Sequence, residues 1–356
     1  MSNVYEARIQ ALRAKLEGAG IDGLYVTDEY NVSYLTGTRG KDCTLWISQT
    51  EAVIITDFRY REMAQNLNHL TLFETSLQVP YMDFFRGLSC SRIGVEKNSL
   101  PLEKYLDMTA QLSGKPIVPV SGLIEALRQI KDEEEIRRIV EAQKLGDKTF
   151  LHMLDFIKAG MTELEVAAEL EYFFRKKGSD GLSFSTIAVS GPNSSYPHGI
   201  PSERKLQKGD FLTLDFGCVY KGYCGDMTRT VAIGQPTDEM RKVYDIVLQA
   251  QLSACDHIRA GLTGVECDAF ARDVIKAAGY GEFFGHSLGH AVGLQVHESP
   301  RYSMAYTDPI PENVIVSIEP GIYLPGKFGV RIEDLAIVKK DGFINLHNAP
   351  KEIIVL

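Results

Sequence analysis

The sequence predicts an α+β protein of two domains, a smaller α/β domain over residues 1–125 and a larger domain over residues 126–356. Its 356 residues exceed the roughly 100–200 residues of a typical single domain. Short strands and helices fill the first third. Long charged helices follow, and then strand pairs joined by tight turns. Hydrophobic residues make up 44% of the chain and charged residues 24%, as in compact globular proteins.

The first domain is expected to begin with an amphipathic helix that ends near Gly18 and Gly20. The predicted apolar stripe of this helix comprises Val4, Ile9, Leu12 and Leu16. A strand follows from Gly23, and the segments LWIS and AVIIT are expected to form a hairpin around Gln49 and Thr50. Further short strands are predicted at Ile93–Glu96 and Ile117–Val120.

The second domain is expected to begin with long helices across residues 123–178. The segment KDEEEIRRIVEAQKL supplies an acidic first turn and an apolar stripe at Ile136, Ile139 and Ala142. Beyond Ser183, the strand patterns FLTLDFG, TRTVAIG, VIVSIEPGIYL and GVRIEDLAIV alternate with helices near residues 237–260 and 264–278. These strand patterns predict antiparallel hairpins.

Charge and composition limit the classes of partner and compartment. The formal net charge of −9, without a long Lys/Arg cluster, argues against nucleic acid and anionic membranes. No apolar run approaches the roughly 20 residues that span a bilayer, and charges interrupt the N-terminal segment. The six cysteines lack CxxC spacing, so we expect reduced, mostly buried thiols in a cytoplasmic protein.

Two acids flank a predicted hairpin in FLTLDFGCVYKGYCGDMTRTV. Asp215 and Asp226 lie nearly equidistant from a turn near Tyr220 and Lys221, where Gly222 can adopt an unusual backbone angle. In that register the two carboxylates face each other on adjacent strands, with Cβ atoms roughly 4.5–5.5 Å apart. Like charges so placed repel each other, and a cation between them removes that penalty.

A second hairpin repeats the arrangement, because Glu319 and Glu333 are equally far from a turn centred on Gly326. Four acids on two hairpins offer hard oxygen ligands for two divalent ions. Ions about 3.5–4 Å apart require such bridging carboxylates. The sequence therefore predicts a dinuclear metal site.

A histidine cluster supplies a nitrogen ligand for that site. His286, His290 and His297 fall within twelve residues of FFGHSLGHAVGLQVHESP, interrupted by glycines. A simple helical clamp is therefore not expected, and not all three need contact metal. Any one acid or histidine alone is more often a solvated or hydrogen-bonded residue. Solvation or a hydrogen bond does not in the same way explain four acids within apolar strands, since buried charge is costly unless it is paired or metal-bound.

The chain resembles the pita-bread metallopeptidases, specifically the branch of prolidases (Xaa-Pro dipeptidases) and Xaa-Pro aminopeptidases. The resemblance is carried by DFG…GDMTRT, GHAVG…VHE, IEPGIY and GVRIED, while DEYNVSYLTGT and VIITDFRY are similar to the creatinase-type N-terminal domain of that branch. It spans nearly the whole chain. It implies a creatinase-like domain over 1–125, a pita-bread catalytic domain over 126–356, and a homodimer that acts on proline-containing peptides.

The resemblance also implies a ligand set for two divalent ions, manganese in the first place or else cobalt or zinc. The implied ligands are Asp215, Asp226, His290, Glu319 and Glu333, with Asp226 and Glu333 bridging both ions. The implied non-ligand site residues, which face or support the substrate, are His198, His286, His297 and Arg331. Glu319 is the candidate for handling the proton, and the histidines for orienting substrate or assisting proton movement.

Two positions bear on the details of this resemblance. The family's GHGxG reads Gly289-His290-Ala291-Val292-Gly293 here, and the Ala291 methyl group fits if φ is negative. Arg301 matches a position where prolidases carry an arginine for the carboxylate at the end of a dipeptide. A guanidinium can bind a carboxylate through two parallel hydrogen bonds.

Other functions remain open at this stage. An Xaa-Pro aminopeptidase would act on longer peptides. A creatinase-like hydrolase works without metal, but all five ligands are retained; a methionine aminopeptidase usually lacks the N-terminal domain. A non-enzymatic interaction module on the same scaffold would be expected to lose ligands.

Overall fold

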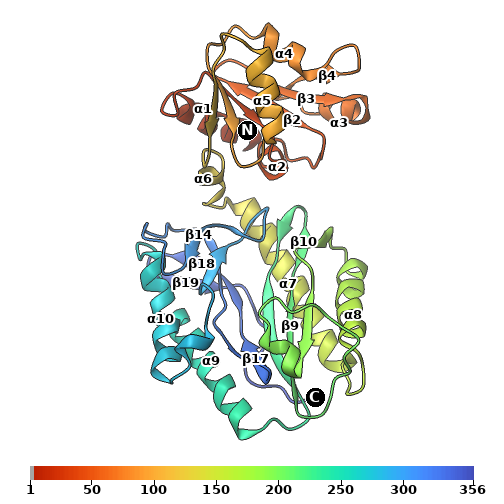
Figure 1. Ribbon diagram of the computed structural model, residues 1–356, viewed down its shortest axis with the longest axis vertical. Coiled ribbons are helices and arrows are strands. Elements are labelled where there is room, and N and C mark those ends of the chain that lie inside the picture. Colours follow the sequence, from red (N-terminus) through yellow and green to blue (C-terminus); the bar gives the residue numbers. More distant parts are fainter. Residues whose placement is uncertain (1–3) are drawn as a thin grey trace. The chain divides into compact units, whose positions relative to one another are not determined.

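A computed structural model describes residues 4–356, and the chain divides after Arg128 into two compact units. Each unit has its own hydrophobic core. Helices and strands are mixed in both, as Figure 1 shows, which agrees with the predicted α+β class. Within the described residues, no helix is long and apolar enough to cross a membrane.

The first unit is built on a sheet with the strand order β4-β3-β2-β1-β5-β6. Antiparallel pairing joins β1, β2 and β3, and the other neighbours are parallel. The strands are β1 (Gly23–Val26), β2 (Thr44–Ser48), β3 (Ala52–Asp57), β4 (Thr71–Thr75), β5 (Ile93–Glu96) and β6 (Ile117–Val120). The helices are α1 (Val4–Leu16), α2 (Glu29–Thr36), α3 (Arg61–Gln65), α4 (Tyr81–Gly87), α5 (Leu102–Gln111) and α6 (Glu125–Arg128), with a 3-10 turn η1 (Phe58–Tyr60).

Most local predictions for this unit are confirmed. The β2–β3 hairpin pairs Leu45 with Ile54, which centres its turn on Gln49 and Thr50. In α1 the predicted stripe is buried at Ile9, Leu12 and Leu16, whereas Val4 is 43% exposed. Val4 is the first residue of α1, so the stripe is one position shorter than predicted.

Four long helices organise the second unit: α7 (Glu133–Phe156), α8 (Glu163–Lys176), α9 (Asp238–His257) and α10 (Gly264–Ala277). Reciprocal side-chain caps define where three of them begin, at Asp132 with Glu135, Thr162 with Glu165 and Thr263 with Glu266. The predicted helices near 237–260 and 264–278 are confirmed as α9 and α10. Short 3-10 turns are η2 (Gly191–Ser195) and η3 (Gly281–Phe283).

The strands of this unit pair antiparallel in the orders β12-β9-β8, β11-β10-β7, β14-β13-β15-β18-β19 and β16-β17. They are β7 (Gly181–Leu182), β8 (Ile187–Ser190), β9 (Asp210–Phe216), β10 (Cys218–Tyr220), β11 (Tyr223–Cys224), β12 (Met227–Ile233), β13 (Gly289–Ala291), β14 (Glu298–Tyr302), β15 (Ile315–Ile318), β16 (Gly321–Leu324), β17 (Phe328–Arg331), β18 (Asp334–Lys339) and β19 (Gly342–Asn345). The predicted antiparallel hairpins are therefore confirmed.

Two helix pairs enclose these strands (Figure 1). One core contains residues of α9 and α10 together with β13 to β18. The other contains residues of α7 and α8 together with β9 and β12. The hairpins that carry the predicted site residues thus lie between two rigid helical layers, and their strands are buried along most of their length.

Candidate metal centre

A single cavity of 480 Å³ in the second unit gathers the side chains that the sequence singled out. Its ionisable lining residues are His198, Asp215, Asp226, His286, His290, His297, Arg301, Glu319, Arg331 and Glu333. Its apolar lining includes Phe184, Ile187, Pro197, Ile200 and Val296. Residues far apart in the sequence, from Phe184 to Glu333, therefore converge on one chamber whose lining is partly acidic and partly apolar.

The first hairpin delivers Asp215 and Asp226, but in a different register from the predicted one. Asp215 pairs with Thr228, not with Asp226. The turn falls at Lys221 and Gly222, both with positive φ, because a two-residue turn of this kind matches the twist of the strands it joins. This moves the pairing by two positions. Since side chains alternate with a period of two, Asp226 still points to the same side as Thr228, and the two carboxylates share one face.

The second hairpin has the predicted register. Ile318 pairs with Asp334, and Gly321 pairs with Arg331. Glu319 and Glu333 lie between these two pairs and therefore oppose each other. The turn is centred on Gly326, whose φ of 72° is the left-handed conformation that glycine adopts most readily.

The carboxylates form an excess of buried negative charge at the base of the cavity. Ligand atoms of Asp226, His290 and Glu333 all lie within 4.8 Å of one another. Burial, followed by repulsion from neighbouring acids, raises the pKa of Asp226 and of Glu333 well above the ordinary carboxyl range. Among the described residues, Asp215 Oδ1 and Glu333 Oε1 are buried without a hydrogen-bond partner. Unpartnered carboxylate oxygens beside an imidazole are a donor set that fits divalent cations.

A protonated histidine partly offsets this charge. His290 Nε2 lies 3.2 Å from Glu319 Oε1 and 3.8 Å from Asp226 Oδ2. Burial opposes charge on both partners, but the contact with Glu319 raises the pKa of His290 to about 9, and His290 in turn lowers that of Glu319 to about 2. Ser317 also donates to Glu319 Oε1 over 3.0 Å. His290 Nε2 therefore lies against both Glu319 and Asp226.

A hydrogen-bonded chain supports the other side of the acid group. Arg331 Nη2 donates to Asp215 Oδ2 over 2.5 Å, and Arg331 Nη1 donates to the Tyr323 hydroxyl over 2.6 Å. Tyr323 OH lies 2.9 Å from His286 Nε2. Since this hydroxyl accepts from Arg331, its own proton is available to His286, whose pKa is lowered chiefly by burial. These contacts fix the Asp215 carboxylate and keep His286 neutral.

Three further predicted residues line the cavity outside the group formed by Asp226, His290 and Glu333. The rings of His290 and His297 have centroids 4.3 Å apart. Burial, followed by the charge on His290, lowers the pKa of His297 to about 4. His198 and Arg301 line the same cavity. Their roles toward a substrate stay predictions.

Two residues of the site were not singled out from the sequence. Thr228 Oγ1 donates to Glu333 Oε2 over 2.7 Å and accepts from Arg331 Nε over 3.1 Å, and Tyr323 joins Arg331 to His286. The alternation of side chains gives one available signal, since Thr228 lies two positions after Asp226 and Tyr323 two positions after Gly321, which pairs with Arg331. Ala291 belongs to β13, and Lys221 and Asn313 are the non-glycine residues of positive φ in the described chain. The alanine therefore fits its position.

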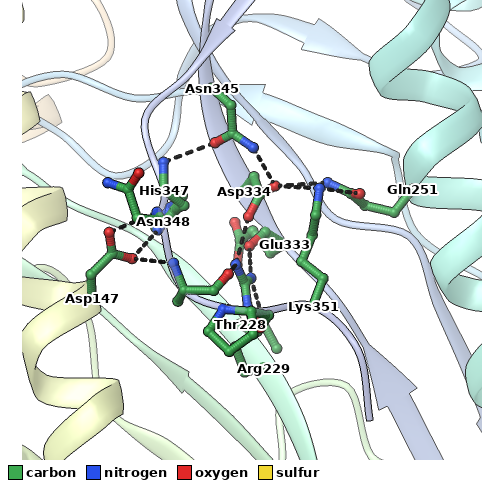
Figure 2. Close-up of polar contacts among 12 residues, drawn as sticks. Asp147, Thr228, Arg229, Gln251, Glu333, Asp334, Asn345, His347, Asn348 and Lys351 are labelled. Carbon is green, nitrogen blue, oxygen red and sulfur yellow. Dashed lines mark hydrogen bonds and ion pairs between the residues drawn. The ribbon is translucent and has the colours of Figure 1, made fainter.

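Behind the cavity lies a buried acid, Asp334, whose two carboxylate oxygens both have partners. Asp334, the residue after Glu333, forms an ion pair with Arg229, with Asp334 Oδ1 2.8 Å from Arg229 Nη2. Asp334 Oδ2 accepts hydrogen bonds from Gln251, Asn345 and Lys351, as Figure 2 shows. Arg229 also donates to the carbonyl oxygen of Glu333. This buried network holds the main chain of an acid that faces the cavity.

Comparison with known proteins shows that two family models match this sequence. Residues 137–340 match metallopeptidase family M24, and residues 8–130 match the creatinase/prolidase N-terminal domain. An uncharacterised peptidase of Bacillus subtilis, YqhT, is 43% identical over 98% of this chain and 100% of its own length.

Two solved structures are similar over almost the whole chain. A Xaa-Pro dipeptidase from Bacillus anthracis is 41% identical with a TM-score of 0.95, covering 99% of this chain and 100% of its own. An X-Pro aminopeptidase from Thermotoga maritima is 38% identical with a TM-score of 0.88, covering 95% of this chain and 98% of its own.

Proposed function

The chain belongs to metallopeptidase family M24 and carries the creatinase/prolidase N-terminal domain, and from this premise we propose that it hydrolyses the peptide bond before proline in Xaa-Pro dipeptides. The observation that carries the proposal is the convergence of the acid group, the histidines and Arg301 on one cavity. The similar structures bear the names of both a dipeptidase and an aminopeptidase. Cleavage of longer Xaa-Pro peptides is therefore the second candidate function.

The proposed ligands of two divalent cations are Asp215, Asp226, His290, Glu319 and Glu333. Asp226 and Glu333 are proposed to bridge both ions, which agrees with the crowding that raises their pKa values and with the unpartnered Glu333 oxygen. Such cations, when bound, supply positive charge that makes water a better nucleophile near neutral pH and stabilises charge developing on the carbonyl oxygen. Manganese is the proposed metal, with cobalt or zinc as alternatives.

The remaining side chains hold charge and protons in place. Glu319 is proposed to handle the proton. It is ionised at neutral pH, because its contact with His290 outweighs burial and lowers its pKa to about 2. Arg331 fixes the Asp215 carboxylate from one side, which limits how that ligand can rotate. His198, His286 and His297 are proposed to face the substrate. Because burial lowers the pKa values of His286 and His297, these two rings are neutral at pH 7.

The preference for dipeptides rests on Arg301 and is tested by its replacement. Arg301→Ala should raise the KM for Ala-Pro and Leu-Pro by a loss of roughly 1.5–3 kcal/mol, the range for a hydrogen bond to a charged group. Hydrolysis of an Xaa-Pro-Xaa tripeptide should change far less. Arg259→Ala is a matched control, because Arg259 is exposed and does not line the cavity.

Steady-state kinetics of both substrate classes with added Mn²⁺ distinguish the two functions. Equal losses on dipeptide and tripeptide, or a wild type that prefers tripeptides, would assign the protein to the aminopeptidases and leave the metal chemistry intact. Elemental analysis tests the remaining alternative, a non-enzymatic module. Gently purified protein with stoichiometric metal supports the enzyme, and protein without metal that also fails to bind Mn²⁺ contradicts it.

We further propose that the protein is a cytoplasmic homodimer. The cytoplasm is supported by six cysteines that form no disulfide within the described residues and four of which are buried, namely Cys43, Cys90, Cys218, Cys224, Cys255 and Cys267. The homodimer rests on the family resemblance alone. Light scattering of the purified protein tests it, since a monomer mass at micromolar concentration contradicts the assignment.

A further inference from the structure

The main chain of Asp226 is held by a side chain from a helix. Asp226 N donates to Gln143 Oε1 over 3.0 Å, and Gln143 Nε2 donates to Asp226 O over 2.8 Å. Gln143 belongs to α7 and is only 1% exposed. Pairing of β12 with β9 begins one residue later, at Met227. The Gln143 amide therefore takes the place of a neighbouring strand at this one peptide.

Gly225 makes this contact possible. A Cβ atom added to Gly225 would lie 2.6 Å from Gln143 Oε1 and 3.1 Å from the Cβ of Ala142. A side chain at that position would displace the helix from the Asp226 peptide. The glycine before Asp226 is thus required by the close approach of α7.

The Gln143 amide is itself oriented by two residues behind it. Its contacts with the Asp226 N–H and C=O determine which side-chain atom is nitrogen and which is oxygen. The same nitrogen lies 2.6 Å from His347 Nε2, so His347 accepts there and carries its proton on Nδ1. His347 Nδ1 is 3.1 Å from Asp147 Oδ1. His347 Nε2 also lies 3.2 Å from Asp226 O, and the Gln143 amide donates to both.

Asp147 completes the chain by holding the C-terminal segment that carries His347. It accepts from the backbone N–H groups of Asn348 over 2.8 Å and Ala349 over 3.3 Å. Figure 2 shows the Asp147 carboxylate directed at His347 and Asn348. Asp147, His347 and Gln143 thus form a buried chain of hydrogen bonds that ends at the peptide group of Asp226.

We propose that Gln143, oriented by His347 and Asp147, is a positioning residue that sets the affinity of the site for divalent cations by fixing the main chain of Asp226. This inference rests on the proposed function, in which Asp226 is a ligand. Only one short side chain separates the Asp226 carboxylate from the peptide group that Gln143 holds. Any movement of that peptide group therefore also moves the carboxylate oxygens proposed to bind the cations. Groups behind the ligands of a metal site typically contribute 10–100-fold in affinity.

The test is Gln143→Met, which keeps the volume and removes both hydrogen bonds to Asp226. Isothermal titration of metal-free protein with Mn²⁺ should show binding weakened by roughly 10–100-fold. The visible absorption of the Co²⁺-loaded variant should change, because the coordination of the ion changes. Thr149→Val is the matched control on the same helix, since its hydroxyl bonds only to Leu145 O among the contacts described for α7. The control should bind Mn²⁺ as the wild type does.

A purely structural role for Gln143 gives a different result. The variant would then unfold at lower temperature in EDTA but keep the wild-type Mn²⁺ affinity and Co²⁺ spectrum, and that outcome overturns the inference. If Gln143→Met does not fold, His347→Gln provides the second measurement. This variant keeps the hydrogen bonds between Gln143 and Asp226 but removes the ring that orients the Gln143 amide. A weakening of roughly three- to tenfold is expected, less than the 10–100-fold of a full loss; unchanged affinity overturns the inference. A wild type that binds no Mn²⁺ counts against the proposed function instead.

Discussion

Glu333 and Asp334 are neighbours in the chain but serve two different regions, the cavity and the polar network behind it. Glu333 accepts one hydrogen bond, from Thr228, and its other oxygen has no partner among the described residues. Asp334 is paired with Arg229 and accepts from three further side chains (Figure 2). Burial, then Asp226 and Glu319, raise the pKa of Glu333. Burial acts in the same direction on Asp334, but Arg229 and Lys351 outweigh it and lower its pKa.

The two regions differ in how far the charge of a buried carboxylate is compensated by its neighbours. A buried carboxylate costs several kcal/mol unless a partner compensates it. Behind the cavity, arginine and lysine provide that compensation permanently. The negative charge of the acids that face the cavity is only partly compensated. A cation bound there would be coordinated by free carboxylate oxygens and would relieve the repulsion between the carboxylates. The acids of the proposed metal site are therefore incompletely paired, whereas the acid that supports them, Asp334, is completely paired.

The largest effect is expected for Glu333→Gln. This substitution removes one of the charges proposed to bridge both cations, so turnover should fall by at least about 1000-fold, equivalent to roughly 4 kcal/mol. The metal-free variant should be no less stable than the wild type, because the repulsion with Asp226 is relieved. Activity assays and urea unfolding in EDTA measure the two effects. Near-normal turnover with two bound metals would contradict the bridging role.

Asp334→Asn should have the opposite profile. It leaves Arg229 without its carboxylate partner in the interior, and breaking such a pair costs about 3–5 kcal/mol. Urea unfolding of the metal-free protein measures this loss. The comparison between the two regions fails if Asp334→Asn costs less than Glu333→Gln under the same conditions.

The smallest effect concerns the pH dependence of stability at Asp147. Burial opposes its ionisation, but the hydrogen bond from His347 and the backbone N–H groups of Asn348 and Ala349 outweigh it and lower the pKa of Asp147. Since the folded-state pKa is below the ordinary value of about 3.9, Asp147 stabilises the fold above that pH and ceases to do so as the pH falls through its folded-state pKa.

Unfolding free energies between pH 6 and pH 3 test this expectation. The metal-free wild type should lose more stability over that interval than Asp147→Asn, which lacks the titrating group. A variant with an unchanged or steeper loss would show that the acid sensitivity originates elsewhere.

The two hairpins show how far local sequence reasoning reaches. For the hairpin around Gly326, the apolar strands and the glycine turn were sufficient to predict the register. That register places Glu319 opposite Glu333. Around Gly222 the turn lies one residue further along than predicted, because Lys221 also adopts positive φ. That conformation is uncommon for a residue with a side chain, so the pattern did not reveal it. The even shift preserved the shared face of Asp215 and Asp226, which is why the site could still be anticipated.

The sequence by itself determined the α+β class, the positions of most strands and helices, and the set of acids and histidines that meet in the cavity, because periodicity and turn residues act over short stretches of chain. The tertiary structure alone decided how these residues are supported. Gln143 meets Asp226 and His347 across 83 and 204 positions, and Arg229 meets Asp334 across 105. Such pairs are brought together by the packing of α7, the hairpins and the C-terminal segment. No local pattern contains that information, since each partner alone is an ordinary polar residue until the surrounding core removes it from water.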